Sequence, residues 1–303
     1  MALSQITQFY HDLYLIKLIP PLTGFDNFIG VWLFKGEKNF IVDVGPAVTS
    51  QQLIQALNKL NINHLDYILL THIHIDHAGA IGDITAHFPQ TPVICHAKGI
   101  SHLAEPSRLW EGTLQTLGKI AQKYHPFTPV SSDRFISADQ FTSSCVTAIE
   151  TLGHSPHHVS FLTDDYLFAG EAGGVCLSVR ETNDYLRPAS PPRFYFDIYL
   201  DSIDRLLMQN PQILCYGHFG LTVDAQKMLK KHRKQLFVWK EVIGDIIKRS
   251  SYENIETECM EHLVEHDNLM QGFALMSDNA KKREQGFLIN SIKGFIEFLG
   301  PIH

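Results

Sequence analysis

The sequence predicts an α/β fold in which a layered core of β-sheet is followed by a cap of helices. Two observations carry this prediction. Short apolar runs with strand character interleave with helical patterns over the first two thirds of the chain, and after Leu221 only helical periodicity remains. The chain has 303 residues, of which 45% are hydrophobic, and this is enough for one large domain or two smaller ones.

The strand predictions rest on short apolar runs that are bounded by turn residues. A hairpin turn over residues 35–38 joins two of these runs, and Gln51 to Leu60 follows them with a helical pattern. The predicted strands are Leu13 to Leu18, Phe28 to Phe34, Asn39 to Val42, Tyr67 to Leu70, Thr91 to Cys95, Val146 to Thr151, Val159 to Leu162, Tyr166 to Ala169 and Ile213 to Tyr216.

Helical patterns predict an insertion at about residues 98–126, a helix near 197–208 and the C-terminal cap. The insertion either covers a site as a lid or simply packs on the core. We therefore expect a first domain over residues 1–225 and a helical cap over 226–303. The apolar side of the last helix is expected to pack on its own chain, with a homodimer as the alternative. That side comprises Phe287, Ile292, Phe295 and Phe298.

Composition and charge argue against several classes of protein. The net charge of -7 gives no electrostatic reason to expect binding to nucleic acid or to a membrane surface. No apolar run approaches the ~18 residues of a membrane span, and the N-terminus lacks the basic and apolar regions of a signal peptide. The five cysteines are scattered and contain no CxxC pair, which indicates a reducing compartment. We expect a cytoplasmic protein with a small-molecule substrate.

The most informative segment is Thr71 to Gly79, with the sequence THIHIDHAG. It follows a predicted strand and precedes a helical pattern, so it is a loop of the kind that displays functional groups. Imidazole and carboxylate are the ligands that zinc and other divalent transition metals prefer. Residues two apart in an extended loop project to the same side. His72 and His74 can therefore share one ion, while Asp76 and His77 can face a second.

A structural role is the alternative for these side chains. A single buried histidine is usually satisfied by hydrogen bonds and binds no metal. Three histidines and one aspartate within six positions would instead leave several buried polar groups unpaired, at a cost of about 1–3 kcal/mol each. A metal site therefore explains the segment better.

Four more polar residues follow predicted strands in the same way. His154, Glu171 and His218 each come directly after a glycine, as a tight turn at a strand end requires. Asp43 follows the predicted strand that ends one residue before it. The sequence therefore predicts that these residues meet at the strand ends.

Together these residues resemble the signature of the metallo-β-lactamase-fold hydrolase superfamily. That signature is His-x-His-x-Asp-His, followed by a lone histidine, a bridging acid and a final histidine. The resemblance covers roughly residues 10–225. It implies an αββα sandwich of two mixed β-sheets flanked by helices, with the metals at one edge. The C-terminal helical extension is similar to that of the glyoxalase II-like and thioesterase-like branch.

The resemblance also implies roles for these residues. Two ligand sets share a bridge, with His72, His74 and His154 in the first set, Asp76, His77 and His218 in the second, and Glu171 between them. Asp43 matches the carboxylate that orients a ligand imidazole from behind. The expected cofactors are two divalent metal ions, with zinc as the expected metal and iron or manganese as alternatives.

One residue departs from the family pattern, because the bridging acid is usually aspartate and this chain has Glu171. The extra methylene moves the carboxylate outward by about one bond length. Glu171 either bridges two ions in shifted positions or binds one ion only, and the sequence leaves both alternatives open.

The expected function is hydrolysis of a small ester, thioester or similar acyl substrate by a metal-bridged hydroxide. Asp76 would orient this nucleophile and carry its proton toward the leaving group. The homoserine-lactone-hydrolysing branch places a tyrosine three residues after the bridging acid, where this chain has Gly174. The alternatives are a phosphodiesterase, a weakly active ligand-binding or regulatory protein, and a di-iron redox site. The last is disfavoured because the flavo-diiron branch has glutamate in place of His74.

Two further groups of residues have open roles. His157 and His158 lie close to His154 in the sequence, with a role around the site or at the surface as alternatives. The basic run from Lys227 to Lys234 is expected to be a solvated helix face, with attraction of an anionic substrate as the alternative.

Overall fold

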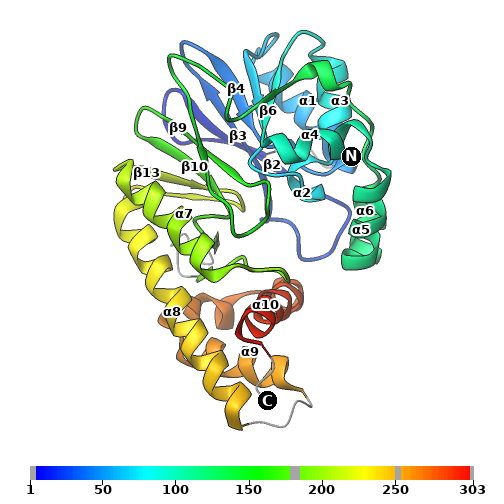
Figure 1. The fold of residues 1–303 in the computed structure, drawn as a ribbon. Helices are drawn as coiled ribbons and strands as arrows, with labels where there is room; N and C mark the ends of the chain where they lie inside the picture. The colour runs from blue at the N-terminus through cyan, green and yellow to red at the C-terminus, as the bar shows by residue number, and fades with distance from the viewer. Residues whose placement is uncertain (1–4, 178–184, 250–253, 301–303) are drawn as a thin grey trace.

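The first of two large mixed sheets is built from the N-terminal part of the chain (Figure 1). The computed structural model describes residues 5–177, 185–249 and 254–300. This sheet has seven strands in chain order: β1 (Gln5–Gln8), β2 (Leu13–Leu18), β3 (Ile29–Lys35), β4 (Asn39–Val42), β5 (Tyr67–Leu69), β6 (Val93–Cys95) and β7 (Phe135–Ser137).

The second sheet comes from the later part of the core. In sheet order its strands are β14 (Leu221–Thr222), β13 (Ile213–Tyr216), β10 (Tyr166–Gly170), β9 (Val159–Thr163) and β8 (Thr147–Glu150). A separate antiparallel ribbon pairs β11 (Val175–Leu177) with β12 (Tyr185–Arg187).

Parallel neighbours in each sheet bring the important loops together. Strand β4 pairs in parallel with β5, and β10 pairs in parallel with β13. The carboxyl ends of parallel neighbours lie at the same edge of a sheet. The loops that begin at Asp43 and Thr71 are therefore adjacent, and so are the loops that begin at Glu171 and Gly217.

Alternate strand residues pack into two cores. Leu69 belongs to the cluster between the sheets, with Trp32 and Phe168, whereas Ile68 points to the outer cluster. Trp32 Nε1 also donates to Tyr216 O at 2.9 Å, which joins the two sheets.

Helices cover both outer faces of the two sheets. Figure 1 shows α1 (Ser50–Lys59) and α3 (Ile81–His87) outside the first sheet, and α7 (Phe196–Met208) and α8 (Ala225–Arg249) beside the second. The result is the expected αββα sandwich, with further helices at the C-terminal end.

The segment expected to be a helical insertion consists of three helices. These are α4 (Ala97–Ala104), α5 (Ser107–Leu117) and α6 (Lys119–Tyr124). Helix α6 buries Ala121 and Tyr124 and contacts the short helix α2 (Ile75–Ala78). The insertion therefore packs directly on the segment that carries Asp76 and His77.

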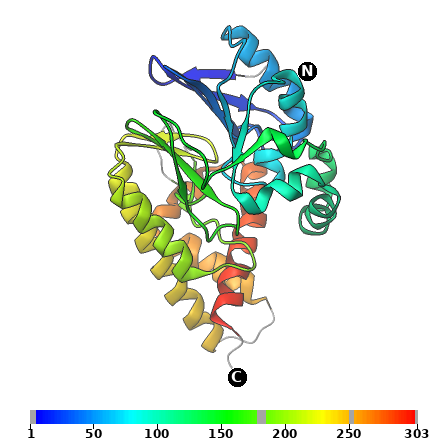
Figure 2. The same ribbon diagram turned by 45° about the horizontal axis from the view of Figure 1, so that its top comes forward.

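The C-terminal helices gather at one end of the molecule. They are α8, α9 (Ile255–His266), the 3-10 helix η3 (Asn268–Leu275) and α10 (Asp278–Leu299). Figure 2 shows α10 extending from beneath the sheets toward the far end of this group. Phe295 of α10 is buried, with ring centroids 4.9 Å from Phe194 and 5.7 Å from Trp239. The apolar side of α10 thus packs on its own chain, as expected.

Several elements differ from the sequence-based expectation. Strands β1, β7, β11, β12 and β14 were not predicted, because each has four residues or fewer and lacks a long apolar run. The expectation that only helices follow Leu221 is wrong for the first residues of this region. Leu221–Thr222 forms a short strand that pairs with β13, and the helical part begins at Ala225. Among the described residues, no helix is both long and apolar enough to cross a membrane.

Candidate metal centre

The seven predicted ligands come from four loops and lie together at one edge of the sandwich. Their ligand atoms form two groups, and within each group all atoms lie within 4.8 Å of one another. The first group contains His72, His74, His154 and Glu171, and the second contains Asp76, His77 and His218. The structure therefore brings together every residue of the predicted ligand set.

The loop after β5 divides its ligands between extended and helical backbone. His72 and His74 precede α2, and His74 has extended backbone with φ -64° and ψ 153°. Asp76 and His77 lie within the single turn of α2. The change from extended to helical backbone directs the two pairs of side chains to different groups.

Asp43 holds the two halves of this loop from behind. Its buried carboxylate accepts hydrogen bonds from Thr71 N at 2.8 Å and from Thr71 Oγ1 at 2.9 Å. Asp43 Oδ2 also accepts a hydrogen bond from His77 Nδ1 at 2.8 Å. When the imidazole is neutral, the proton on Nδ1 leaves the lone pair of His77 Nε2 directed at the centre.

Three other imidazoles are oriented in the same way, each through a donor at Nδ1. The acceptors are Thr71 Oγ1 for His72 (3.0 Å), Ala189 O for His154 (2.9 Å) and Phe28 O for His218 (3.2 Å). For His72 the direction follows because the Thr71 hydroxyl proton is donated to Asp43. Each Nε2 is therefore free to act as a ligand.

The Glu171 carboxylate faces both groups. Its Oε2 lies 2.6 Å from His154 Nε2 and 3.3 Å from His72 Nε2. Its Oε1 lies 3.2 Å from His218 Nε2 in the other group. The longer glutamate side chain thus faces both groups of candidate ligands.

Burial and charge in the centre favour a bound cation. Burial holds the pKa of His72 well below its usual value and lowers the pKa of His74 to about 4, so both imidazoles are neutral. His72 Nε2 is fully buried and has no hydrogen-bond partner among the described residues. Buried acceptors that converge without a donor are costly. A divalent ion would satisfy them, so this donor set fits a metal such as zinc.

The carboxylates concentrate negative charge at the same place. Burial alone would lower the pKa of His77, but Asp43 and then Asp76 raise it to about 9. Burial would raise the pKa of Glu171, yet the surrounding imidazoles, with His154 first, hold it well below the usual range. The raised pKa of His77 reflects the carboxylates around it, and the lowered pKa of Glu171 means that its carboxylate is ionised, so the centre holds negative charge that a cation can neutralise.

The glycines before two ligands are required by the backbone. Gly153 has φ +126° and Gly170 has φ +55°, conformations that favour glycine. A Cβ on Gly170 would lie 2.5 Å from His158 Nε2. At Gly217 the reason is close approach, since a Cβ there would lie 2.9 Å from the backbone of Gly170.

Residues that the sequence did not assign hold Glu171 in place. His158 is fully buried, and its Nε2 accepts a hydrogen bond from Glu171 N at 3.1 Å, so a surface role is wrong for this residue. Tyr199 donates its hydroxyl proton to Glu171 O. The sequence pointed to His158, because this residue lies close to His154 in the chain. It gave no such indication for Tyr199, which comes from α7.

His157 is partly buried and lies beside the first group of candidate ligands. Its ring centroid is 5.9 Å from that of His74, and burial lowers its pKa to about 2. Its Nδ1 lies 3.1 Å from Ser155 Oγ. His157 is therefore a neutral imidazole beside the first group.

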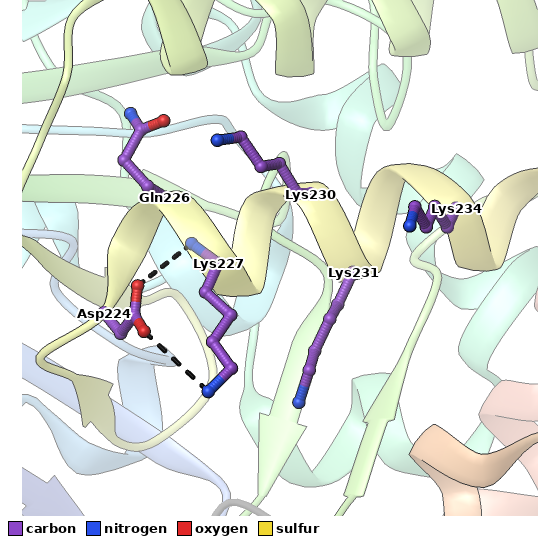
Figure 3. Close-up of a pocket in the computed structure, with 6 residues that line it drawn as sticks. All are labelled: Asp224, Gln226, Lys227, Lys230, Lys231 and Lys234. Carbon is purple, nitrogen blue, oxygen red and sulfur yellow. Dashed lines mark hydrogen bonds and ion pairs between the residues drawn. The ribbon is translucent and has the colours of Figure 1, made fainter.

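None of the candidate ligands lines the hollow beside the basic run on α8. This hollow of about 350 Å³ is lined by Asp224, Gln226, Lys227, Lys230, Lys231 and Lys234 (Figure 3). In Figure 3, Lys230 leaves the helix on one side and Lys227 and Lys231 on the other, and all are exposed. This arrangement supports the interpretation as a solvated helix face.

Proteins of similar sequence or structure share this architecture. The Sulfurisphaera tokodaii metallo-beta-lactamase fold-containing protein ST1585 is 27% identical over 212 residues, covering 64% of this chain and 78% of the relative. Its crystal structure, from Sulfolobus tokodaii, has a TM-score of 0.68 at 22% identity and covers 93% of this chain and 97% of that chain. The structure of the metallo-beta-lactamase family protein TTHA1429 from Thermus thermophilus has a TM-score of 0.63 at 17% identity. The match covers 96% of this chain and 94% of that chain.

A shorter match comes from another kind of protein. The Escherichia coli anaerobic nitric oxide reductase flavorubredoxin is 34% identical over 73 residues, which are 24% of this chain and 15% of the relative. These matches do not single out the glyoxalase II-like or thioesterase-like branch, which stays a prediction. The family model of the metallo-beta-lactamase superfamily matches residues 27–218, more than half of the chain, and the protein therefore belongs to that superfamily.

Proposed function

We propose that this protein is a binuclear metal-dependent hydrolase that acts on a small ester, thioester or similar acyl substrate. The observation that carries the proposal is the position of Glu171, whose two carboxylate oxygens face different ligand groups at 2.6 Å and 3.2 Å. A carboxylate between two sets of imidazole acceptors matches the position of a bridging ligand.

The residues present would divide between two ions. His72, His74 and His154 would hold the first ion, and Asp76, His77 and His218 would hold the second, with Glu171 between them. Two divalent ions there would supply an activated water and a Lewis acid for the acyl carbonyl. The imidazoles that are fixed through Nδ1 need little rearrangement to bind.

Asp76 is the candidate acid–base group. Its Oδ2 lies 3.7 Å from His218 Nε2, and its side chain is 14% exposed. This position lets the carboxylate accept a proton from the attacking water and pass it to the leaving group. The other candidate ligands are buried except His74, which is partly exposed, and this burial excludes most of the bulk water.

The cysteines give no support to a covalent mechanism. Cys95 and Cys215 are buried, and burial raises the pKa of the Cys95 thiol to about 12 and that of Cys215 well above its usual value. The thiolate is the nucleophilic form, so these side chains are poor nucleophiles at neutral pH.

The proposal is tested by metal analysis together with a substrate screen. We expect two ions per chain by elemental mass spectrometry and turnover of acetyl or butyryl thioesters and esters. His74→Ala should abolish the turnover, whereas the control His64→Ala should keep it, because His64 is exposed. Cleavage of bis(4-nitrophenyl) phosphate without any acyl turnover would overturn the proposal in favour of a phosphodiesterase. Tight metabolite binding without turnover would indicate a regulatory protein instead.

A further inference from the structure

A pocket of about 260 Å³ lies between the helical insertion and the last helix. Its volume is slightly below the range of about 300–1,000 Å³ that is typical of small-molecule sites. The lining residues that matter here are Leu117 and Ile120 from α5 and α6, and Arg283, Phe287, Asn290 and Lys293 from α10. No acidic side chain is among the described residues that line it.

Aromatic rings connect the pocket to the candidate metal centre. Phe287 stacks on Phe28 with ring centroids 5.2 Å apart, and Phe28 stacks on His218 at 4.1 Å. Arg283 Cζ lies 4.2 Å from the centroid of Phe28. The inner end of the pocket is therefore one aromatic ring away from a candidate ligand.

Tyr124 adds an unused polar group on the same side. It follows Ile120 by one turn of α6, and its hydroxyl is buried without a hydrogen-bond partner in the part of the chain that is described. Asp76 and Arg283 both lie close enough to act on the pKa of this hydroxyl, which burial raises well above its usual value. The hydroxyl thus interacts electrostatically with a residue that lines the pocket, Arg283, and with the candidate catalytic carboxylate of Asp76.

Several of the lining residues follow one another along α10. Arg283, Phe287, Asn290 and Lys293 recur at helical spacing, so they share one face of the helix. Ten residues at 1.5 Å each separate Arg283 from Lys293 by about 15 Å along the helix axis. Apolar side chains lie between a cation at the inner end and a cation at the outer end.

Positive charge is in excess at the inner end. The Arg283 side chain is only 4% exposed and donates from Nε to Glu284 Oε1 at 3.0 Å and from Nη1 to Gly24 O. Glu284 also accepts from Arg187 Nε at 2.7 Å, so two guanidinium groups share one buried carboxylate. A guanidinium has five N–H donors, and a buried cation without full compensation attracts an anion.

Lys293 provides the outer charge. It is exposed and forms no ion pair with any described residue. Asn290 precedes it by one turn of α10 and offers an amide N–H for the same ligand group.

We propose that this pocket binds the acyl part of the substrate, and that the substrate is an amphipathic acyl compound with an anionic group remote from the bond that is cleaved. The apolar chain lies on Leu117, Ile120 and Phe287, with its reactive end toward the metal centre. Lys293 binds the anionic end at the pocket mouth, whereas Arg283, about 15 Å away at the inner end, adds only a long-range attraction. The substrate class named here rests on the proposed hydrolase function.

The test measures binding rather than turnover, so it does not depend on hydrolysis. Titration calorimetry of the metal-loaded protein compares ω-hydroxydodecanoate with neutral dodecanediol, neither of which can be hydrolysed. We expect the carboxylate to bind about tenfold more tightly, equivalent to about 1.4 kcal/mol. In Lys293→Gln the preference should fall to about threefold or less. The control Lys281→Gln, on the opposite face of α10, should keep it.

Two outcomes would overturn the inference. Equal affinity for both probes would show that the pocket does not select an anion. A tenfold preference that persists unchanged in Lys293→Gln would show that the carboxylate binds elsewhere, for example at the metals. A protein that hydrolyses no acyl substrate yet shows the expected pattern of binding would contradict the proposed function and leave the anionic ligand class supported.

Discussion

Asp43 Oδ2 accepts a hydrogen bond from His77 Nδ1 at 2.8 Å, and the same carboxylate accepts two from Thr71. The Thr71 hydroxyl in turn accepts a hydrogen bond from His72 Nδ1 at 3.0 Å. One carboxylate therefore orients an imidazole of each ligand group, directly for His77 and through Thr71 for His72. This arrangement gives the first prediction.

Asp43→Asn should weaken metal binding by about 10–100-fold. The amide nitrogen would face His77 Nδ1 and favour the tautomer with a proton on Nε2, which cannot bind a metal. Asparagine tolerates the left-handed backbone at this position, where φ is 61°, so the fold should survive. Competition with a chromogenic chelator measures the affinity.

Asp164→Asn is the matched control for this experiment. Asp164 is exposed and also has a positive φ, of 45°, in the turn between β9 and β10. The control should bind metal like the wild type. Equal metal affinity in all three proteins would contradict the orienting role of Asp43.

The sequence reveals the ligand set because each ligand marks a strand end. Asp43 follows an apolar strand directly, and His154, Glu171 and His218 follow glycines whose backbone geometry or close approach the structure explains. These signals are local, and local patterns can be read from one chain. They place the loops at the strand ends, whereas the αββα order was implied only by the resemblance to the superfamily.

The surroundings of the centre could not be predicted, because they depend on contacts between distant residues. Tyr199 reaches the Glu171 carbonyl from α7, and Arg283 reaches the Phe28 ring from the last helix. The short strands escaped prediction for another reason. Strand β1 is mostly exposed, so no apolar run marks it, and its pairing with β2 defines it.

Glu171→Asp should reduce the affinity for at least one of two ions. Shortening the side chain by one methylene withdraws the carboxylate, which now lies 2.6 Å from His154 Nε2 and 3.2 Å from His218 Nε2. Elemental mass spectrometry after dialysis against a weak chelator measures the number of ions retained. Glu150→Asp serves as the control, because that side chain is half exposed. Two ions retained equally in wild type and Glu171→Asp would show that the reach of glutamate is not needed.

Removal of metal should lower the thermal stability of the protein. Without a cation, the neutral imidazoles of His72 and His74 converge with no donor to satisfy them, and His72 Nε2 lacks a hydrogen-bond partner among the described residues. An ion at about one hundred times its Kd would stabilise the folded state by about 2.7 kcal/mol. Differential scanning calorimetry with and without chelator measures the change. The His74→Ala variant should respond less, and an unchanged midpoint in the wild type would argue against a metal centre.

Glu284→Gln should destabilise the protein at neutral pH by about 3–5 kcal/mol, because it removes the buried carboxylate that Arg187 and Arg283 share. Burial would raise the pKa of Glu284, yet the two guanidinium groups lower it below the ordinary value of 4.5. A carboxylate with a lowered pKa stabilises the folded state above its unfolded pKa, and this contribution is lost as the pH falls through the folded pKa.

The difference in stability between wild type and Glu284→Gln should therefore be full at neutral pH and shrink as the pH falls below about 4.5. Urea unfolding at a series of pH values measures this difference, with Glu261→Gln on the exposed side of α9 as the control. Because the other carboxylates titrate in both proteins, only the difference reports on Glu284. A difference that does not change with pH would mean that the charge of Glu284 contributes nothing, and that its packing alone joins α10 to β12.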